Sequence, residues 1–316
     1  MATLGAHAFA GSPAKDRLLR LVPVNADIVA GIEDPHHNDQ SGRLLIVTHN
    51  DDADLRDWIA LAGLVDERQQ VDKLIEAAAS SPRGELSEHL LLVGGSFHGG
   101  ATLQAAESAG GVRRGYKGIA IVELKPSARE QQETRDTRWL AMLDDNTALF
   151  GSPVMVQKAL DRYLSSAPAD AQLVKRMSGL RPDVNCWSIL TMPGRMMAAH
   201  VLPSVLDEAS AALLRRVTSL SISVHYGSKD RVDFIFDTEN TEAATALATA
   251  ISGPPSLLSV ADALHAHLES VAVRQNEVRG SVRVAEKEFD PWLAGLRGAS
   301  RHASDGENVA RAGAVR

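Results

Sequence analysis

The residues most suggestive of chemistry form a glycine-rich run, Gly94-Gly95-Ser96-Phe97-His98-Gly99-Gly100, between a predicted strand and a predicted helix. Glycines at such a junction let backbone N–H groups approach a phosphate or another anion. The run departs from the phosphate-binding loop, because Ala101 stands where the lysine is needed. It departs from the nucleophile elbow as well, because His98 replaces the second glycine.

The pattern therefore favours a flexible strand-to-helix turn. The alternative is a ligand-binding protein or an enzyme that uses this loop together with His98. Its candidate ligand-binding residues are Gly95, Ser96, His98 and Gly100.

A second group combines histidines and carboxylates, which are ligands that zinc takes in proteins. His36, His37 and His49 lie on either side of a predicted strand. Adjacent His36 and His37 point to opposite faces of an extended backbone, and Asp51 and Asp52 are placed to cap the following helix. We expect solvated loops here and no bound metal.

The remaining polar candidates do not form a coordinated acid and base. Glu85, Glu88 and His89 cluster at the start of a strand, where capping or solvation explains them. His265 and His267 stand at i and i+2 of a predicted helix, about 200° apart, so they cannot share a ligand. We therefore expect no catalytic residue and no cofactor.

The elements that would position these residues follow mixed periodicities, which favour an α+β fold. Apolar residues alternate with serine over residues 219–224, and the alternation resumes after a turn at 227–230 with Val232, Phe234 and Phe236, which predicts an antiparallel hairpin. A second hairpin is expected over residues 139–150. Single strands are expected at residues 28–32, 44–48, 89–93, 118–124, 185–190 and 278–284.

Several segments have a helical period. Residues 54–63 give the clearest pattern, and Val71, Leu74, Ile75 and Ala78 predict a second helix. A third helix is expected to open with Ser152 as its N-cap and Pro153 at its first position. Further helices are expected at residues 195–216, 241–251 and 257–273.

A loose internal repeat of about 160 residues predicts two similar units of mainly antiparallel sheet packed with helices. Strands 28–32 and 185–190 both follow a Leu-x-Pro segment, and Tyr116-Lys117-Gly118-Ile119 resembles Val278-Arg279-Gly280-Ser281. The expected organisation is a tail or signal-peptide remnant, two units and a disordered tail, at residues 1–15, 16–166, 173–297 and 298–316, with the boundary between the units near 167–172.

Composition excludes several classes of protein. The 316 residues are 44% hydrophobic, which is enough for a sizeable core. The net charge of -7 disfavours binding to nucleic acid, whose phosphates require an excess of positive charge. The longest apolar runs are too short for a transmembrane helix. The single cysteine, Cys186, is expected to be a small buried hydrophobic residue.

The first residues bear on the compartment. Ala8-Phe9-Ala10 resembles the small-x-small end of a secretory signal peptide, although the basic and apolar parts do not precede it in this sequence. Two interpretations stay open. A signal peptide that starts further upstream would place the protein in the periplasm or outside the cell, and otherwise these residues are the tail of a cytoplasmic protein.

Leu19, Pro23 and Ala26 form a Leu-x-x-x-Pro-x-x-Ala segment. With the duplication, this segment resembles bacterial secreted or envelope proteins built from a repeated α+β unit. The resemblance implies no catalytic residue. The sequence therefore favours a non-catalytic binding or protein-interaction protein of the bacterial cell envelope, with a protein partner or self-association as its mode of action.

Overall fold

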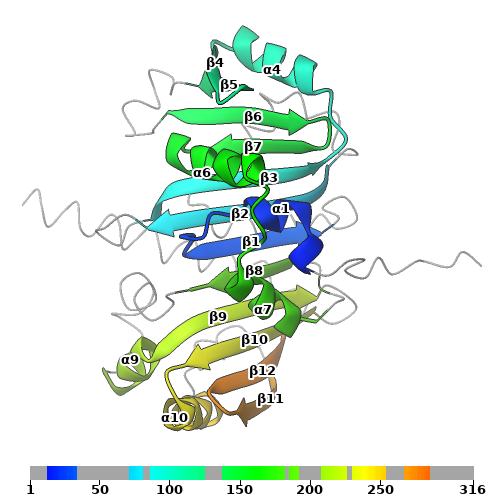
Figure 1. Cartoon of the computed structure of the whole chain (residues 1–316). Helices are drawn as coiled ribbons and strands as arrows, with labels where there is room; N and C mark the ends of the chain where they lie inside the picture. Colours follow the sequence, from blue (N-terminus) through cyan, green and yellow to red (C-terminus); the bar gives the residue numbers. More distant parts are fainter. Residues whose placement is uncertain are drawn as a thin grey trace, which may run out of the picture. The chain divides into compact units, whose positions relative to one another are not determined.

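The computed structural model describes residues 13–33, 71–80, 86–124, 137–181, 184, 186–191, 208–225, 230–253 and 267–284. Contacts divide the chain into two compact units, of which the first runs to Cys186 and the second begins at Trp187. In each unit an antiparallel sheet packs with helices (Figure 1). The α+β class predicted from the sequence is confirmed.

The sheet of unit 1 is antiparallel throughout. Its strands are β1 (Ile28–Glu33), β2 (Val71–Ser80), β3 (Leu86–Gly95), β4 (Val112–Tyr116), β5 (Ile119–Leu124), β6 (Arg138–Asp144) and β7 (Thr147–Gly151). They lie in the order β1-β2-β3-β7-β6-β5-β4, so β4 is an edge strand. The hairpin predicted over residues 139–150 is confirmed as β6–β7.

One row of side chains runs across this sheet and forms its core. The register aligns residues of β2, β3, β7, β6 and β5, which are Ile75, Leu92, Leu149, Ala141 and Ile121. Each is at most 1% exposed. Full burial of a Leu or Ile side chain contributes roughly 1.5–3 kcal/mol, so this row is a major source of the stability of unit 1.

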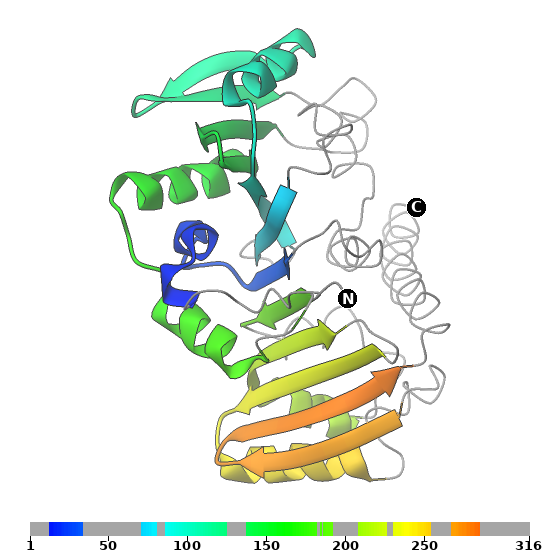
Figure 2. The ribbon, with the colours of Figure 1, turned by 90° about the vertical axis from the view of Figure 1, so that its right-hand side faces the viewer.

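Helices α1 (Arg17–Leu21) and α6 (Pro153–Leu164) lie on the same side of this sheet (Figure 2). Pro153 occupies the first position of α6, as predicted, because its fixed φ suits a helix start and its missing N–H would have no partner there. Val156 and Leu160 are buried. Ser152 is the N-cap, but its side chain makes no capping hydrogen bond.

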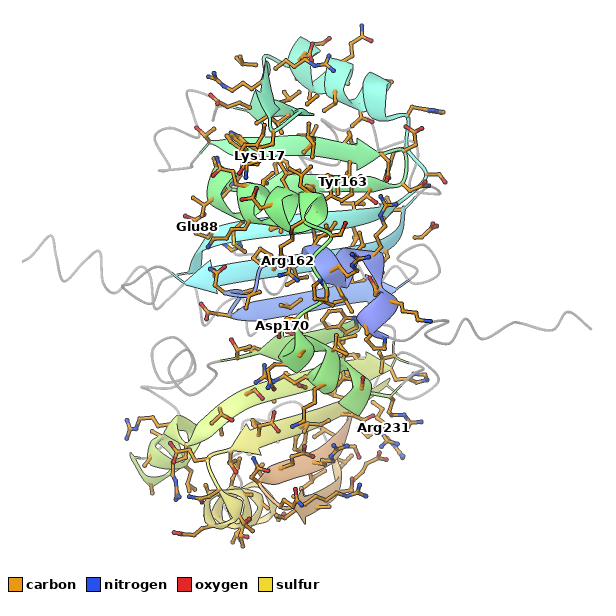
Figure 3. All side chains as sticks on the ribbon, in the orientation of Figure 1. Glu88, Lys117, Arg162, Tyr163, Asp170 and Arg231 are labelled. Atoms are coloured by element: carbon orange, nitrogen blue, oxygen red, sulfur yellow. The ribbon has the colours of Figure 1, made fainter. Side chains whose placement is uncertain are left out.

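Two arginines connect α1 to the chain that follows α6. Arg162 donates through Nε to the carbonyl of Arg20 (2.8 Å), and Arg20 donates to the carbonyls of Ser166 (3.0 Å) and Ala167 (3.2 Å). Figure 3 shows Arg162 on α6 above α1. Burial lowers the pKa of the Arg162 guanidinium, while nearby Asp170 acts in the opposite direction. The exchange of side-chain donors anchors the N-terminal helix.

Helix α7 (Ala171–Gly179) follows the boundary that the sequence predicted near residues 167–172. It contacts the short 3-10 helix η1 (Pro13–Lys15), which belongs to unit 1. Asp170 caps α7 by accepting from the Leu173 N–H (2.9 Å). The division between the units therefore comes later in the chain, at Cys186 and Trp187.

The helix predicted from Val71, Leu74, Ile75 and Ala78 is wrong, because these residues form strand β2. β2 pairs with β1 on one side and with β3 on the other. Every residue from Leu74 to Ala79 is buried, so both faces of the strand are covered. A strand of this kind has a continuous apolar run without alternation, and such a run matches helical spacing equally well.

Unit 2 has a smaller sheet in the order β8-β9-β10-β12-β11, in which β9, β10, β12 and β11 pair in antiparallel fashion. Its elements are β8 (Cys186–Leu190), α9 (Glu208–Arg215), β9 (Val217–His225), β10 (Asp230–Thr238), α10 (Thr241–Ser252), β11 (His267–Arg274) and β12 (Glu277–Val284). The predicted hairpin of β9 and β10 is confirmed, with Phe234 opposite Ile222. Helix α10 packs against β10, β11 and β12 and lies behind the strands in Figure 2.

The helix predicted over residues 257–273 is wrong from His267 onward, where the chain forms β11. The spacing argument for His265 and His267 therefore does not hold, and His265 lies outside the described residues. β11 is an edge strand and is exposed at most of its positions, so it lacks the alternation that identifies a half-buried strand.

The strand orders of the two units can be written in the same way. In each unit three strands are neighbours in order, a helix follows, and a hairpin then places its first strand at the edge, as β4–β5 in unit 1 and β11–β12 in unit 2. Unit 1 has the β6–β7 hairpin between β3 and β5. The duplication itself stays a prediction.

One detail of the predicted repeat does not correspond in the structure. Tyr116-Lys117-Gly118-Ile119 spans the turn of the β4–β5 hairpin, whereas Val278-Arg279-Gly280-Ser281 lies inside β12. A turn and a strand interior are not equivalent positions, so this four-residue match carries no support for the repeat.

Candidate functional site

The glycine-rich loop between β3 and α4 (Gly99–Ser108) lies against the turn of the β6–β7 hairpin. The Gly95 N–H donates to the carbonyl of Asn146 (3.1 Å), and the Phe97 N–H donates to the carbonyl of Asp145 (2.7 Å). The side-chain amide of Asn146 donates a hydrogen bond to the carbonyl of Gly95 (2.8 Å). These backbone groups of the loop are therefore already hydrogen-bonded to the hairpin turn.

The N-terminus of α4 faces a carboxylate of the same chain. The Gly99 N–H lies 3.4 Å from Oδ1 of Asp145. An anion near a helix N-terminus is favoured by the helix dipole, and Asp145 occupies that place here. Of the candidate ligand-binding residues, Gly95 is buried, while Ser96, His98 and Gly100 are exposed. These four residues are close in sequence, but the described residues form no enclosed site around them.

Other residues singled out from the sequence fall into two groups. His36, His37, His49, Asp51, Asp52 and Glu85 lie outside the described residues. His89 lies in β3, with Nδ1 at 3.6 Å from Oε1 of the buried Glu76 on β2. Cys186 is buried, as its apolar surroundings in sequence predicted. Among the residues that the structure describes, no group of three or more His, Cys, Asp or Glu could hold a metal ion.

The β4–β5 hairpin is an exposed polar feature of unit 1, because four of the five residues of β4 are exposed. Its two-residue turn consists of Lys117 (φ 48°) and Gly118 (φ 88°), both in the left-handed region. Two such residues make a type I′ turn, whose twist matches that of the paired strands. Gly118 adopts this conformation without a steric penalty. The turn therefore specifies the register of β4 on β5.

A small polar cluster fixes the hairpin tip to α6. Lys117 Nζ donates to Oδ1 of Asp161 (2.6 Å), and the Tyr116 hydroxyl donates to the same oxygen (3.0 Å). Lys117 lies near α6 in Figure 3. The hydrogen bond from Lys117 lowers the pKa of the Asp161 carboxyl, and the same bond raises the pKa of Lys117. The hairpin is held in place while its outer edge stays free.

Two arginines flank that edge on opposite faces of the sheet. Arg114 makes a two-bond pair with Glu123 on β5 (2.7 and 3.3 Å), and Arg113 pairs with Glu107 on α4 (3.1 Å). Their side chains are 52% and 55% exposed. A shallow, open groove of about 490 Å³ is lined by residues of both strands of the hairpin. Its lining residues are Arg113, Arg114, Gly115, Gly118, Ile119 and Ala120.

Packing within the described part of the chain does not explain why position 115 of β4 is a glycine. Gly115 is exposed, it has no positive φ, and a Cβ built on it would meet none of the residues that the structure describes within 4 Å. Glycine inside a strand weakens the strand, and it often marks a place where another backbone approaches closely. This makes the outer edge of β4 the candidate binding site.

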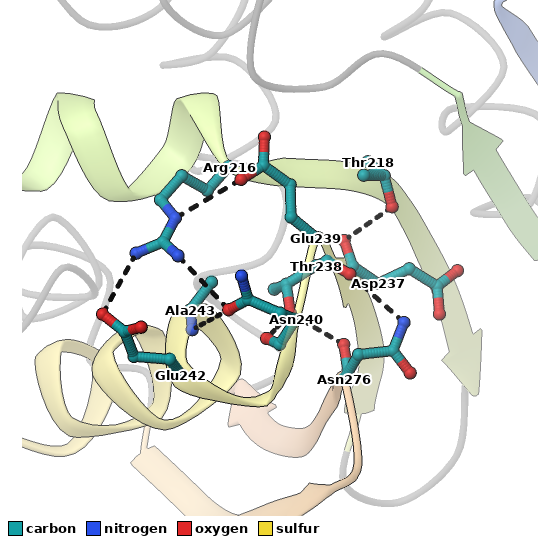
Figure 4. A network of polar contacts seen from close by, with 9 residues as sticks. All are labelled: Arg216, Thr218, Asp237, Thr238, Glu239, Asn240, Glu242, Ala243 and Asn276. Atoms are coloured by element: carbon teal, nitrogen blue, oxygen red, sulfur yellow. Dashed lines mark hydrogen bonds and ion pairs between the residues drawn. The ribbon is translucent and has the colours of Figure 1, made fainter.

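In the polar network of unit 2 that Figure 4 shows, the side chains bond to groups of the same unit. Asn240 accepts from the Ala243 N–H at the start of α10 and from Arg216. The Thr238 hydroxyl donates to the carbonyls of Asn240 and Asn276. Each of these groups holds one element against another, so the network is structural.

Sequence reasoning missed β4 because an exposed edge strand carries no core-facing alternation. Val112-Arg113-Arg114-Gly115-Tyr116 contains three residues that favour solvent or flexibility. A local signal was present in the Lys117-Gly118 pair between two short β-prone runs, since glycine at the second position of a two-residue loop indicates a hairpin.

Comparison with a solved structure supports the architecture. The chain is similar to crystal form I of TP0453, with a TM-score of 0.53 and 12% sequence identity, over 92% of this chain and 98% of that chain. No protein-family model and no curated protein matches the chain. At this level of identity the similarity establishes the α+β fold and carries no residue roles. No described helix has both the length and the apolar content that crossing a membrane requires.

Proposed function

We propose that this is a non-catalytic protein-interaction protein of the bacterial cell envelope, and that it binds its partner through the outer edge of the β4–β5 hairpin. The observation that carries the proposal is the exposed edge strand β4, which also lines a shallow groove together with β5. A free edge presents unpaired backbone N–H and C=O groups, which another chain can pair with.

The surroundings of the edge support binding over catalysis. The exposed charges near it form ion pairs with each other, and no described group beside the groove has the geometry of a nucleophile with its base. The tip of the hairpin is hydrogen-bonded to α6 through Asp161. A shallow polar surface of this kind suits recognition of another protein.

The envelope location rests on the sequence. Ala8-Phe9-Ala10 resembles a signal-peptide end, and the segment with Leu19, Pro23 and Ala26 resembles secreted or envelope proteins. We expect the native protein in the envelope fraction, with Gly11 as its first residue by mass spectrometry. A native protein that retains Ala2 in the soluble fraction would replace this with the cytoplasmic interpretation.

A second candidate is the ligand-binding protein or enzyme that uses the loop at residues 94–100. The exposure of Ser96 and His98 favours it, because both side chains are accessible to a small molecule. Against it stands Asp145, whose carboxylate would repel an anion at the N-terminus of α4. This candidate therefore ranks below the hairpin.

Site-specific photo-crosslinking in cells tests the binding surface. A photoreactive amino acid replaces Val112 on β4, and a matched variant carries it at Val154 on α6, since these valines are 43% and 45% exposed. We expect a discrete crosslinked species from position 112 and none from position 154. Equal crosslinking at both positions, or none at either, would reject the hairpin as the binding surface.

A further inference from the structure

We infer that β4 accepts an extended acidic segment of a different protein as an added strand, with the backbone of Gly115 as the central contact. This inference rests on the proposed function and specifies the class of partner. It follows from three features of the hairpin, which are the direction of its free backbone groups, the exposure of the backbone at position 115 and the arginine on either face.

The turn decides which backbone groups of β4 are free. Tyr116 and Ile119 flank a two-residue turn and are paired with each other. In such a hairpin the flanking pair exchanges both hydrogen bonds, and bonded and non-bonded pairs alternate along the strands. Gly115 and Arg113 belong to the non-bonded pairs, opposite Ala120 and Val122. Their N–H and C=O groups therefore point outward from the sheet.

Position 115 is open to a second backbone. Gly115 is exposed, and exposure of a glycine is exposure of its backbone. A Cβ at this position would meet no atom of the described residues within 4 Å. The outward N–H and C=O of this residue are therefore accessible to a strand that lies along the edge. Adding a strand supplies binding energy through main-chain hydrogen bonds and selectivity through alternate side chains.

A second copy of the same edge is a poor partner. The free groups of Arg113 and Gly115 allow a symmetric pairing only in registers that bring arginine opposite arginine or close to it. Like charges directly opposite each other in a sheet are destabilising. Charged residues on an edge are also a common protection against edge-to-edge pairing of identical chains. The occupant is therefore a different chain.

The same arginines favour acidic side chains. A guanidinium has five N–H donors, and Glu123 accepts only two from Arg114. Arg113 and Arg114 alternate along β4, so they serve the two opposite faces of the sheet. An incoming strand with Glu or Asp on both faces would share Arg113 with Glu107 and Arg114 with Glu123, through the guanidinium N–H groups that these glutamates leave unused.

The variant Gly115→Pro tests strand addition directly. Proline removes the outward N–H and places its ring along the free edge, while the ladder to β5 does not use that N–H. Proline is tolerated in edge strands where the N–H faces solvent. Gly115→Ala is the matched control, because it keeps the N–H and its methyl group has room.

The probe is a short fluorescent peptide in which glutamate alternates with valine and threonine, and its counterpart carries lysine in place of glutamate. We expect the glutamate peptide to bind the full chain, to bind Gly115→Ala similarly, and to bind Gly115→Pro at least about tenfold more weakly. The lysine peptide should not bind. Binding of both peptides alike, or equal binding to Gly115→Pro and the full chain, would overturn the inference.

A second variant keeps the experiment decisive if Gly115→Pro does not fold, which circular dichroism would show. The double substitution Arg113→Glu with Arg114→Glu leaves the backbone edge intact and should exchange the preference from the glutamate peptide to the lysine peptide. Unchanged preference would overturn the acidic partner. Concentration-dependent dimers in sedimentation that disappear in Gly115→Pro would overturn it in favour of a second copy.

The two proposals fail in different ways. If crosslinking from position 112 persists in Gly115→Pro at its original yield, the hairpin is the binding surface but strand addition is wrong. If crosslinking is absent in the unmodified chain, the proposed function itself is wrong.

Discussion

The ring of Phe234 on β10 lies directly over Gly280 on β12, its cross-strand partner. A Cβ on Gly280 would stand 2.3 Å from Cζ of Phe234 and 2.7 Å from the carbonyl oxygen of Ser270. One obstacle is a side chain, but the other is the backbone of β11, which cannot move without breaking its ladder. Glycine at this position is therefore required by packing, in contrast to Gly115.

The contrast predicts opposite outcomes for two similar substitutions. Gly280→Ala should lower the free energy of unfolding by about 1–3 kcal/mol, the usual cost of overpacking. Gly115→Ala should change it by no more than about 0.5 kcal/mol, because the methyl group meets nothing. Urea unfolding followed by circular dichroism measures both. Equal destabilisation by the two variants would contradict this account of the two glycines.

Asp145 is expected to exclude anions from the N-terminus of α4. With Asp145 in place, inorganic phosphate should leave the amide NMR signals of Gly99 and Gly100 unchanged. In Asp145→Ala the helix loses its neighbouring carboxylate, so we expect phosphate to shift these signals and stability to fall by about 0.3–1 kcal/mol. Phosphate shifts in the unmodified protein would instead favour the ligand-binding interpretation of the loop.

The ion pair between Lys117 and Asp161 predicts a defined pH dependence. The pKa of Asp161 is lowered on folding, so its contribution is present above the unfolded value, about 3.9, and is lost as pH falls through the folded value. The pKa of Lys117 is raised, so its contribution is lost as pH rises through its folded value. The docking of the hairpin tip on α6 is therefore strongest between these limits.

An NMR titration of the Asp161 carboxyl carbon checks this directly. We expect a midpoint below that of an unperturbed aspartate, and in Lys117→Gln a return toward it. Tyr116→Phe serves as the control, because it removes the weaker of the two hydrogen bonds and should shift the midpoint less. A midpoint that does not move in Lys117→Gln would show that the lysine does not govern the carboxyl.

The thiol of Cys186 should be inert in the folded protein. It is 1% exposed in β8, and a thiol reagent needs direct access to the sulfur. We expect no labelling by Ellman's reagent under native conditions and full labelling in urea. Val112→Cys, with a thiol on the exposed edge, is the positive control. Rapid labelling of Cys186 at neutral pH without denaturant would contradict its burial.

The elements that sequence reasoning predicted are those with one buried face and clear end signals. Pro153 at the first position and the buried Val156 and Leu160 identify α6, and strict alternation around Phe234 identifies the β9–β10 hairpin. β2 was mistaken for a helix because both of its faces are covered. In such a strand, burial removes the period that distinguishes the two structures.

The candidate site was the least accessible to sequence reasoning. A free edge is a property of strand order, and no local pattern states which strand lacks a neighbour. The glycine-rich loop resembles phosphate-binding loops in composition. Its backbone N–H groups, however, donate to the carbonyls of Asp145 and Asn146 in the neighbouring turn. The role proposed for Gly115 depends on the exposure of its backbone at the sheet edge, and only the three-dimensional structure shows that exposure.

The β6–β7 hairpin acts as a spacer within unit 1. It separates β5 from β3 by two strands, whereas β12 lies directly beside β10 in unit 2. Strands lie about 4.8 Å apart, so the hairpin carries β4–β5 about 10 Å farther out than a direct pairing would. A hairpin in this position sets how far the proposed binding edge reaches, independently of the residues on that edge. Changing the number of strands would then move the point of contact while leaving its chemistry intact.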